Sequence, residues 1–427
     1  MTRSQIKLIS LSCLGGMLEF YDFVIFALFA QYFGQAFFPT NDPIANLINT
    51  YAVFAVGYLG RPLGSVIFGH LGDRYGRKYA FTFSAFMMAI STFLMGCLPT
   101  YQQMGLTASV LLIVLRIMQG ISFGGEAGGA TVFIFEHMPY QKRGLGIGLI
   151  FAAIGLGNVL GSFIGYILTH LLDEKALLHW GWRIPFLIGF ILSIVAYFIR
   201  RNTLETPEFV ALQVTQKCRF PIATLLRSHL PQVLTSISLT AITGAAFALL
   251  MYLPNYLTLA SSLTFNRTFS NNLIAFLMVS LFTAIFGYLS DFIGRKTLTI
   301  AGSILMILLS YYLFQLIFFS QQLLLFNCCL ALLAAIVNGC YCCSIAEQFE
   351  TRIRYTGIAL SLNVGITLFA GMTPLASILL FKLTHHLSAP AFFLVACSII
   401  NLIGGLVMKD TRKKETFMLA THTLPEN

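Results

Sequence analysis

The chain has 427 residues, of which 57% are hydrophobic and only 10% carry a charged side chain, whereas a soluble domain has about 25% charged residues. This composition excludes an ordinary water-soluble protein and indicates an integral membrane protein. The formal net charge of +10 would suggest a nucleic-acid partner in a soluble chain. Here the basic residues stand between apolar runs, so they report membrane topology and no nucleic-acid partner is expected.

Twelve apolar runs are long enough to cross a bilayer as helices, which takes about 20 residues each. In chain order, the predicted spans are 8–34, 47–70, 79–98, 108–138, 144–171, 183–200, 232–259, 269–292, 297–318, 322–349, 355–384 and 390–408. The longest polar interruption, 201–231, follows the sixth span and contains the helix-interrupting Pro207 and Pro221. The predicted fold class is therefore all-α and membrane-embedded. It has a six-helix bundle at 1–200, a linker at 201–231, a second six-helix bundle at 232–408 and a tail at 409–427.

Most of the 26 Lys and Arg residues fall in segments that would lie on one side of the membrane. They include the residues before the first span, the linker and the tail. Cytoplasmic loops carry an excess of Lys and Arg. We therefore expect a multi-pass protein of a bacterial inner membrane, with both termini, the linker and the tail in the cytoplasm.

The two halves of the chain share a repeated loop. The residues after the second span, 69–78, are G-H-L-G-D-R-Y-G-R-K, and those after the eighth span, 287–296, are G-Y-L-S-D-F-I-G-R-K. Six of these ten positions are identical. Parallel repeats of six spans are typical of one large transporter fold.

This repeated loop resembles the signature loop of the major facilitator superfamily. Further segments resemble its metabolite:proton symporter group, which includes carriers of 2-oxoglutarate, citrate, shikimate, proline and betaine. They are G-G-M-L-E-F-Y-D-F at 15–23, G-R-P-L-G at 60–64, R-I-M-Q-G at 116–120, G-G-E at 124–126 and W-G-W-R-I-P-F at 180–186. The resemblance implies two bundles around a central cavity and alternating access driven by the proton gradient, with no bound cofactor. The expected partners are membrane lipids, protons and a small-molecule substrate, and the expected state is a monomer.

Five charged residues lie well inside the predicted spans, away from their ends, where a charge is costly and usually functional. Glu19 and Asp22 share a helix face in the first span, Arg61 lies in the second, and Arg116 and Glu126 lie in the fourth. Counting about 1.5 Å per residue puts all but Arg116 near one level, with Arg116 further out. We expect Asp22 or Glu19 to carry the coupled proton first and Glu126 second. Arg61 would switch with them or hold a substrate carboxylate, and Arg116 would attract an anion near the outer entrance. The alternative is a static ion-pair network that joins these spans.

Uncharged polar side chains complete the predicted substrate contacts. These are Gln119, Tyr252, Asn255, Asn338 and Asn363. The resemblance implies that the first, fourth, seventh and tenth spans line the cavity. Tyr252 and Asn255 could instead stabilise a helix break near Pro254.

Charged residues at the inner ends of the spans predict a gate on the cytoplasmic side, since salt bridges that form in one state bias a two-state equilibrium. The predicted gate residues are Asp73, Arg74, Arg77 and Glu136 in the first half, and Asp291, Arg295 and Glu347 in the second. The alternative is simple anchoring by positive charge on the inner side.

Two further patterns have structural interpretations. Gly120, Gly124 and Gly128, and likewise Gly157, Gly161 and Gly165, recur at four-residue spacing, which predicts close packing between the fourth and fifth spans. The cysteines at 340, 342 and 343 fit no zinc-ligand spacing, so no metal site is predicted.

The leading interpretation is a proton-coupled symporter that imports a small polar metabolite. An organic acid is favoured by Arg61 and Arg116, and an amino acid or betaine comes next, because three acids could hold a cation. The alternative is a proton-driven exporter of a small molecule or siderophore-like metabolite. An enzyme is disfavoured, since the sequence offers no nucleophile with its base and no metal set.

Overall fold

The computed structural model describes residues 3–40, 42–75, 77–125, 127–201, 221–260, 265–320 and 322–409, and its regular structure there is helical. The N-terminal half contains α1 (Arg3–Leu28), α2 (Ala30–Phe37), α3 (Pro43–Tyr75), α4 (Arg77–Gly96), α5 (Tyr101–Met104), α6 (Leu106–Gly124), α7 (Ala127–His137), α8 (Arg143–Leu171), α9 (Glu174–His179) and α10 (Ile184–Arg201). The C-terminal half contains α12 (Pro221–Ser228), α13 (Leu230–Ser238), α14 (Ala241–Ala260), α15 (Phe265–Ile293), α16 (Arg295–Ser320), α17 (Leu323–Asn338), α18 (Tyr341–Gln348), α19 (Thr351–Thr384) and α20 (Ala389–Val407). Two short turns, η1 (Tyr140–Lys142) and η2 (Gly181–Arg183), precede α8 and α10.

Each predicted span corresponds to a helix or to a pair of consecutive helices. Ten helical stretches of the described chain are long and apolar enough to cross a membrane, and the bent pair α1–α2 makes an eleventh. The predicted span 79–98 corresponds to α4, whose described apolar part, Thr82–Gly96, is shorter than the others. Most of the predicted linker lies outside the described residues, but its last part is helical, because α12 covers Pro221–Ser228.

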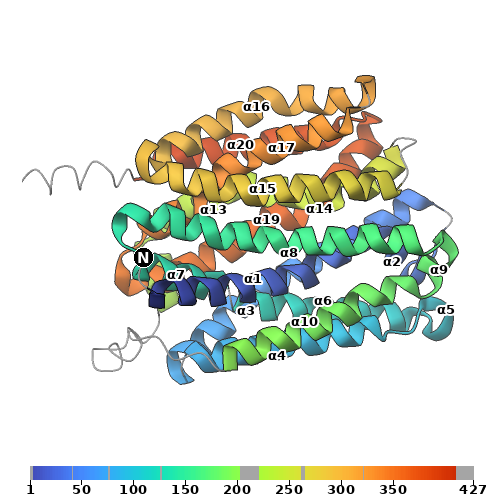
Figure 1. Cartoon of the computed structure of the whole chain (residues 1–427), viewed down its shortest axis with the longest axis horizontal. Helices are drawn as coiled ribbons and strands as arrows, with labels where there is room; N and C mark the ends of the chain where they lie inside the picture. Colours follow the sequence, from blue (N-terminus) through green and yellow to red (C-terminus); the bar gives the residue numbers. More distant parts are fainter. Residues whose placement is uncertain are drawn as a thin grey trace, which may run out of the picture.

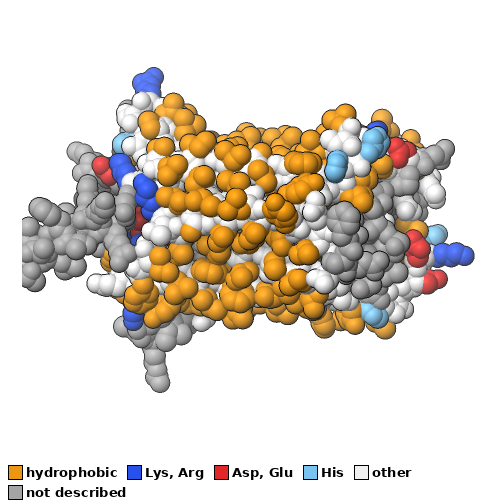
Figure 2. Space-filling view, turned by 90° about the horizontal axis from the view of Figure 1, so that it is seen from above, with side chains coloured by type: hydrophobic (Ala, Val, Ile, Leu, Met, Phe, Trp, Pro, Cys, Tyr) orange, Lys and Arg blue, Asp and Glu red, His pale blue; other side chains and the backbone are white. Residues whose placement is uncertain are grey.

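Figure 2 shows a band of hydrophobic side chains around the middle of the molecule, with Lys and Arg side chains gathered at one end. We call this the basic end; Lys142, Lys296 and Lys409 line a cavity there. Figure 1 marks the N-terminus at the same end, whereas α2, α5 and α9 lie at the opposite end. An apolar belt between two polar ends is what a bilayer-spanning bundle requires.

Every third predicted span is broken into two helices. The first span bends by 61° between α1 and α2 at Phe29. The fourth, seventh and tenth spans break after α6, α13 and α17. The apolar runs had predicted one continuous helix for each of these spans. Two of the breaks begin at a glycine, Gly125 and Gly339, and glycine is a poor helix former. The recurrence indicates a three-helix repeat inside each half.

The two halves pack along two long helix pairs, α8 with α15 and α3 with α19. Figure 1 shows α8 and α15 side by side along their length. Their backbones approach closely, since a side-chain carbon on Gly148 would lie only 2.9 Å from the Cα of Gly287. Glycine at such contacts lets two helices meet with little space between them.

The predicted partner of the two glycine rows is wrong. A side-chain carbon on Gly120 or Gly124 would lie 1.8 or 2.0 Å from carbonyl oxygens of α3, and one on Gly128 would lie 2.6 Å from the side chain of Ala359 in α19. One on Gly157 would lie 2.3 Å from a carbonyl oxygen of α1. Small residues set how closely helices pack, but they do not encode which helix is the neighbour.

Candidate functional site

The close approach of α3 and α6 places two arginines in the interior of the N-terminal half. Arg61 of α3 is 1% exposed and Arg116 of α6 is 0% exposed. The guanidinium carbon of Arg61 lies 4.1 Å from the ring centres of both Tyr58 and Phe123. That of Arg116 lies 4.2 Å from the ring centre of Phe26. Aromatic faces attract a desolvated cation, so these rings help to hold both charges away from water.

Hydrogen bonds connect Arg116 to the buried carboxylate of Asp22 through two uncharged side chains. Arg116 Nη1 donates to Gln119 Oε1 at 2.7 Å, and Gln119 Nε2 donates to Thr92 Oγ1 at 2.8 Å. Thr92 Oγ1 then donates to Asp22 Oδ2 at 3.3 Å. We call this path the Arg116–Asp22 relay. It joins α6, α4 and α1, and every donor in it points toward Asp22.

The Asp22 carboxylate also packs closely against α10. The carboxylate is 1% exposed, and the Ser193 hydroxyl of α10 donates to the same oxygen, Oδ2. The other oxygen, Oδ1, has no hydrogen-bond partner among the described residues. A side-chain carbon on Gly189 of α10 would lie 2.1 Å from it. The missing side chain of Gly189 therefore leaves the space that the Asp22 carboxylate occupies.

Two sequence expectations about the charged residues need comment. Arg116 was expected near an outer entrance, but it is completely buried and linked to Asp22. Counting residues locates the Cα atom, and the long side chain extends away from it. The side chains of Glu19 and Glu126 lie outside the described structure, so their place beside Asp22 stays a prediction.

Asn255 and Tyr252 of α14 face the N-terminal half. Asn255 Nδ2 donates to the carbonyls of Ala27 and Leu28 at 2.9 and 3.2 Å, and Asn255 Oδ1 accepts from the Gln31 amide at 3.2 Å. Asn255 therefore binds at a helix break, as the alternative interpretation proposed, but the break is between α1 and α2 and not near Pro254.

The Tyr252 ring lies 5.7 Å from the Tyr51 ring and 5.8 Å from the Tyr256 ring. Tyr252 is completely buried in this arrangement.

The other two asparagines behave differently from each other. Asn338 Nδ2 donates to Thr283 Oγ1 at 2.9 Å, a contact between α17 and α15 inside the C-terminal half. Asn363 Nδ2 donates to the Gly124 carbonyl of α6 at 3.1 Å. The predicted substrate contacts are therefore not gathered around one cavity. Asn255 and Asn363 join the halves, and Asn338 stays within one.

The halves are closed around these residues toward both ends. A cavity of about 560 Å³ opens at the basic end. Another of about 520 Å³ lies at the opposite end, where its lining includes Gln31, Gln35, Asn46 and Asn255. Between them, Arg61, Arg116 and Tyr252 are at most 1% exposed.

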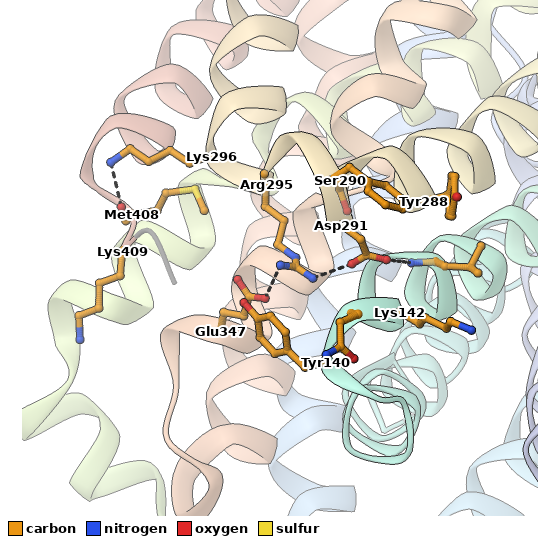
Figure 3. A pocket seen from close by; sticks show the side chains of 14 residues that line it. Tyr140, Lys142, Tyr288, Ser290, Asp291, Arg295, Lys296, Glu347, Met408 and Lys409 are labelled. Carbon is orange, nitrogen blue, oxygen red and sulfur yellow. Dashed lines mark hydrogen bonds and ion pairs between the residues drawn. The ribbon is translucent and has the colours of Figure 1, made fainter. Parts of the chain in front are cut away.

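Figure 3 shows the predicted contact among Asp291, Arg295 and Glu347 at the basic end. Arg295 pairs with Asp291 at 2.9 Å and with Glu347 at 3.0 Å. Asp291 also accepts from the backbone amides of Gly144 and Leu145, at 2.9 and 3.0 Å, in the first turn of α8. A carboxylate is stabilised at a helix N-terminus, so Asp291 of α15 binds the N-terminal half. No pattern in the sequence indicates this link.

The first-half gate is only partly described. Glu136 at the end of α7 pairs with Arg354 of α19 at 3.1 Å, again across the halves. The side chains of Asp73, Arg74 and Arg77 lie outside the described structure, so their part in a gate stays a prediction.

The geometry defines a membrane transporter made of two helical halves that close on each other. Residues 8–219 match the sugar (and other) transporter family. The glycine betaine/proline/ectoine/pipecolic acid transporter OusA of Dickeya dadantii is 34% identical, over 96% of this chain and 84% of its own length. The inner membrane metabolite transport protein YhjE of Escherichia coli K12 is 32% identical, over 96% of this chain and 95% of its own.

Among solved structures, the partially occluded inward-open xylose transporter XylE of E. coli has the same fold. It aligns with a TM-score of 0.74 at 17% identity, over 96% of this chain and 99% of its own. The chain belongs to the major facilitator superfamily, and it is a transporter and not an enzyme.

Proposed function

We propose that this chain imports a small zwitterionic solute of the proline and betaine class together with protons. The observation that carries this proposal is the Arg116–Asp22 relay, which connects a buried cation to a buried carboxylate. Transport proceeds by alternating access of the two halves. The basic end faces the cytoplasm of a bacterial inner membrane, in accordance with the charge bias of the sequence.

The direction of the hydrogen bonds in the relay supports proton coupling. Both hydroxyls at Asp22, those of Thr92 and Ser193, donate to the carboxylate, an arrangement that suits the ionised form. A substrate carboxylate that pairs with Arg116 draws the guanidinium away from Gln119, because bidentate pairing with an anion is stronger than a bond to an amide oxygen. The polarisation of the relay then falls, and protonation of Asp22 becomes easier. Binding of the solute and of the proton thus assist each other.

The choice of solute comes from the relatives and from the rings around the arginines. Proteins of Salmonella typhimurium and E. coli K12 with 35% and 34% identity are named proline/betaine transporters, whereas the two arginines alone favoured an organic acid. A zwitterion uses both features, since its carboxylate pairs with a guanidinium and its ammonium group suits aromatic faces. Tyr252 and Tyr51 offer such faces on either side of the boundary between the halves.

The energetics suit accumulation of a solute with no net charge. One proton that moves through a potential of 100 mV supplies about 2.3 kcal/mol, which supports roughly 50-fold accumulation. The cluster of Asp291, Arg295 and Glu347 and the Glu136–Arg354 pair act as the latch at the cytoplasmic end. They hold this end closed until the solute and the proton are bound.

The test is uptake into proteoliposomes of radiolabelled proline, glycine betaine and 2-oxoglutarate, with and without an inward proton gradient. We expect gradient-driven accumulation of the zwitterions. In Asp22→Asn it is lost, while exchange of solute across the membrane continues. The matched control is Asp42→Asn, which removes an exposed carboxylate outside the helices and leaves accumulation intact.

Other outcomes identify other functions. Accumulation of 2-oxoglutarate alone would restore the organic-acid interpretation. Uptake that is equal with and without the gradient would contradict symport. Gradient-driven loss of solute from loaded vesicles would indicate the exporter.

A further inference from the structure

Pro62 leaves one backbone carbonyl of α3 without its usual helical donor. Proline has no N–H group, so the carbonyl four residues earlier, that of Tyr58, receives no bond from position 62. Thr367 of α19 takes that place, because its hydroxyl donates to the Tyr58 carbonyl at 2.7 Å. The donor comes from the C-terminal half and the acceptor from the N-terminal half.

The break between α1 and α2 has the same solution. In a continuous helix the amide of Gln31 would donate to the carbonyl of Ala27. Here Asn255 stands between them, accepting from Gln31 through Oδ1 and donating to Ala27 and Leu28 through Nδ2. The Ala27 carbonyl also accepts from the Tyr51 hydroxyl of α3 at 3.2 Å, so the Leu28 carbonyl is the one that depends on Asn255. One side-chain amide thus replaces one peptide group at the break.

The break after α6 is the third case. The last carbonyls of a helix lack intrahelical donors, and Asn363 of α19 donates to the carbonyl of Gly124, the final residue of α6. Asn255 and Asn363 are at most 1% exposed, and Thr367 is 7% exposed.

A fourth case lies within one half and serves as the reference. Pro254 leaves the Leu250 carbonyl without a helical donor, and Asn272 of α15 donates to it at 2.6 Å. Both residues belong to the C-terminal half, so this bond need not break when the halves separate. The other three must break.

We propose that Asn255, Asn363 and Thr367 are closing residues, which hydrogen-bond defects in the helices of the N-terminal half when the halves meet. Water takes their place when the halves part. A buried carbonyl must be hydrogen-bonded, and at these positions side chain and water are interchangeable donors. The carbonyls are thereby hydrogen-bonded in both the closed and the open arrangement, which keeps the free energies of the two arrangements close. The inference rests on the separation of the halves and not on which solute or ion is carried.

A native thiol reports this separation. The Cys342 sulfur of α18 lies 3.4 Å from the Thr131 hydroxyl of α7, across the boundary between the halves. The Cys340 sulfur instead contacts Thr299 within its own half. Both thiols are 0% exposed here. Peptide mass spectrometry measures the alkylation rate of each thiol in proteoliposomes. A faster reaction at Cys342 alone reports opening of the boundary, and a faster reaction at both thiols reports general loosening of the C-terminal half.

The experiment is a cycle of Thr367→Val and Pro62→Ala. Thr367→Val keeps the shape but removes the donor, so we expect alkylation of Cys342 to accelerate about tenfold, the effect of one lost buried hydrogen bond. Pro62→Ala restores a backbone N–H that can bond the Tyr58 carbonyl. In that background Thr367→Val should change the rate by less than about twofold. Thr367→Ser and the reference variant Asn272→Leu should leave it unchanged.

Three results would overturn the proposal. The first is no acceleration in Thr367→Val. The second is an equal acceleration with Pro62 and with Ala at that position, which would show that packing and not the carbonyl matters. The third is a parallel rise at Cys340, which would show that the C-terminal half itself has loosened.

Discussion

The interiors of the two halves bury different kinds of polar group. Among the described residues, the N-terminal half buries Asp22, Arg61 and Arg116 deep inside. The C-terminal half buries asparagines and hydroxyls there, and its buried charge, Arg295, lies at the basic end beside two carboxylates. Two bundles built from one repeated plan thus differ in the chemistry of the groups that they bury.

This difference indicates which half carries the ion chemistry and which half supplies the closing residues. A charge in the membrane interior is costly and is retained for function, so we propose that the coupled proton and the solute carboxylate bind in the N-terminal half. The uncharged side chains of the C-terminal half can exchange with water at little cost. They suit a surface that repeatedly leaves and rejoins its partner. The predictions below test this division of labour, beginning with the largest effect.

Gly189→Ala should disrupt the ion chemistry most. The new side-chain carbon would lie 2.1 Å from Asp22 Oδ1, so the carboxylate must move and lose its bonds to Thr92 and Ser193. Because hydrogen bonds to charged groups are the stronger ones, we expect gradient-driven accumulation to fall by about tenfold or more, while exchange continues. Gly96→Ala, where the added carbon would lie 3.1 Å from the Phe186 side chain, is the control on the same α4–α10 contact. An equal loss there would point to helix packing.

Thr92→Val should uncouple the relay with a smaller loss. The variant keeps the volume but breaks the link between Gln119 and Asp22, so solute movement should continue while the ratio of protons to solute falls by roughly half. Parallel measurement of solute uptake and proton uptake gives the ratio. Ser91→Ala is the neighbouring control, because the Ser91 hydroxyl bonds the Met87 carbonyl of its own helix. An unchanged ratio in Thr92→Val would remove the relay from the mechanism.

Thr92 and Ser91 show how much of the site can be predicted from the sequence alone. Asp22, Arg61 and Arg116 were identified because a charge in an apolar run is conspicuous, and the spans were identified because a bilayer demands a certain length of apolar helix. Thr92 and Ser193 were not identified. A hydroxyl in a helix commonly bonds its own backbone, as Ser91 does, and nothing in the sequence distinguishes it from one that bonds another helix.

The contacts between the halves were also beyond the sequence. Pro62 predicts that one carbonyl of α3 needs an outside donor, but not that Thr367, more than three hundred positions away, supplies it. Asn255 and Asn363 were recognised as important polar groups and assigned to the substrate. Their partners are backbone atoms at helix breaks. The four broken spans are continuous apolar runs in the sequence, with no proline at any of the breaks.

Asn255→Leu should shift the equilibrium between the closed and open arrangements of the halves toward the open one. It removes the amide at the α1–α2 break, so water must reach the carbonyl of Leu28, whereas the Tyr51 hydroxyl still donates to the carbonyl of Ala27. We expect the thiol of a Leu47→Cys variant, at a buried position that lines the cavity at the opposite end, to react about fivefold faster with a membrane-impermeant maleimide. The proton-to-solute ratio should not change. A changed ratio would mean that Asn255 takes part in coupling, and the division between the halves would fail.

Asn338→Leu should have the smallest effect on transport. Its amide bonds Thr283 within the C-terminal half, so it neither touches the relay nor crosses to the other half, although the sequence suggested a substrate contact. We expect the apparent affinity for the solute and the proton ratio to stay within about twofold of the original. The loss of one buried hydrogen bond should lower the stability of the half by about 1 kcal/mol, seen as an earlier thermal transition. A large rise in KM at normal thermal stability would instead place Asn338 in the solute site, and would extend substrate recognition into the C-terminal half.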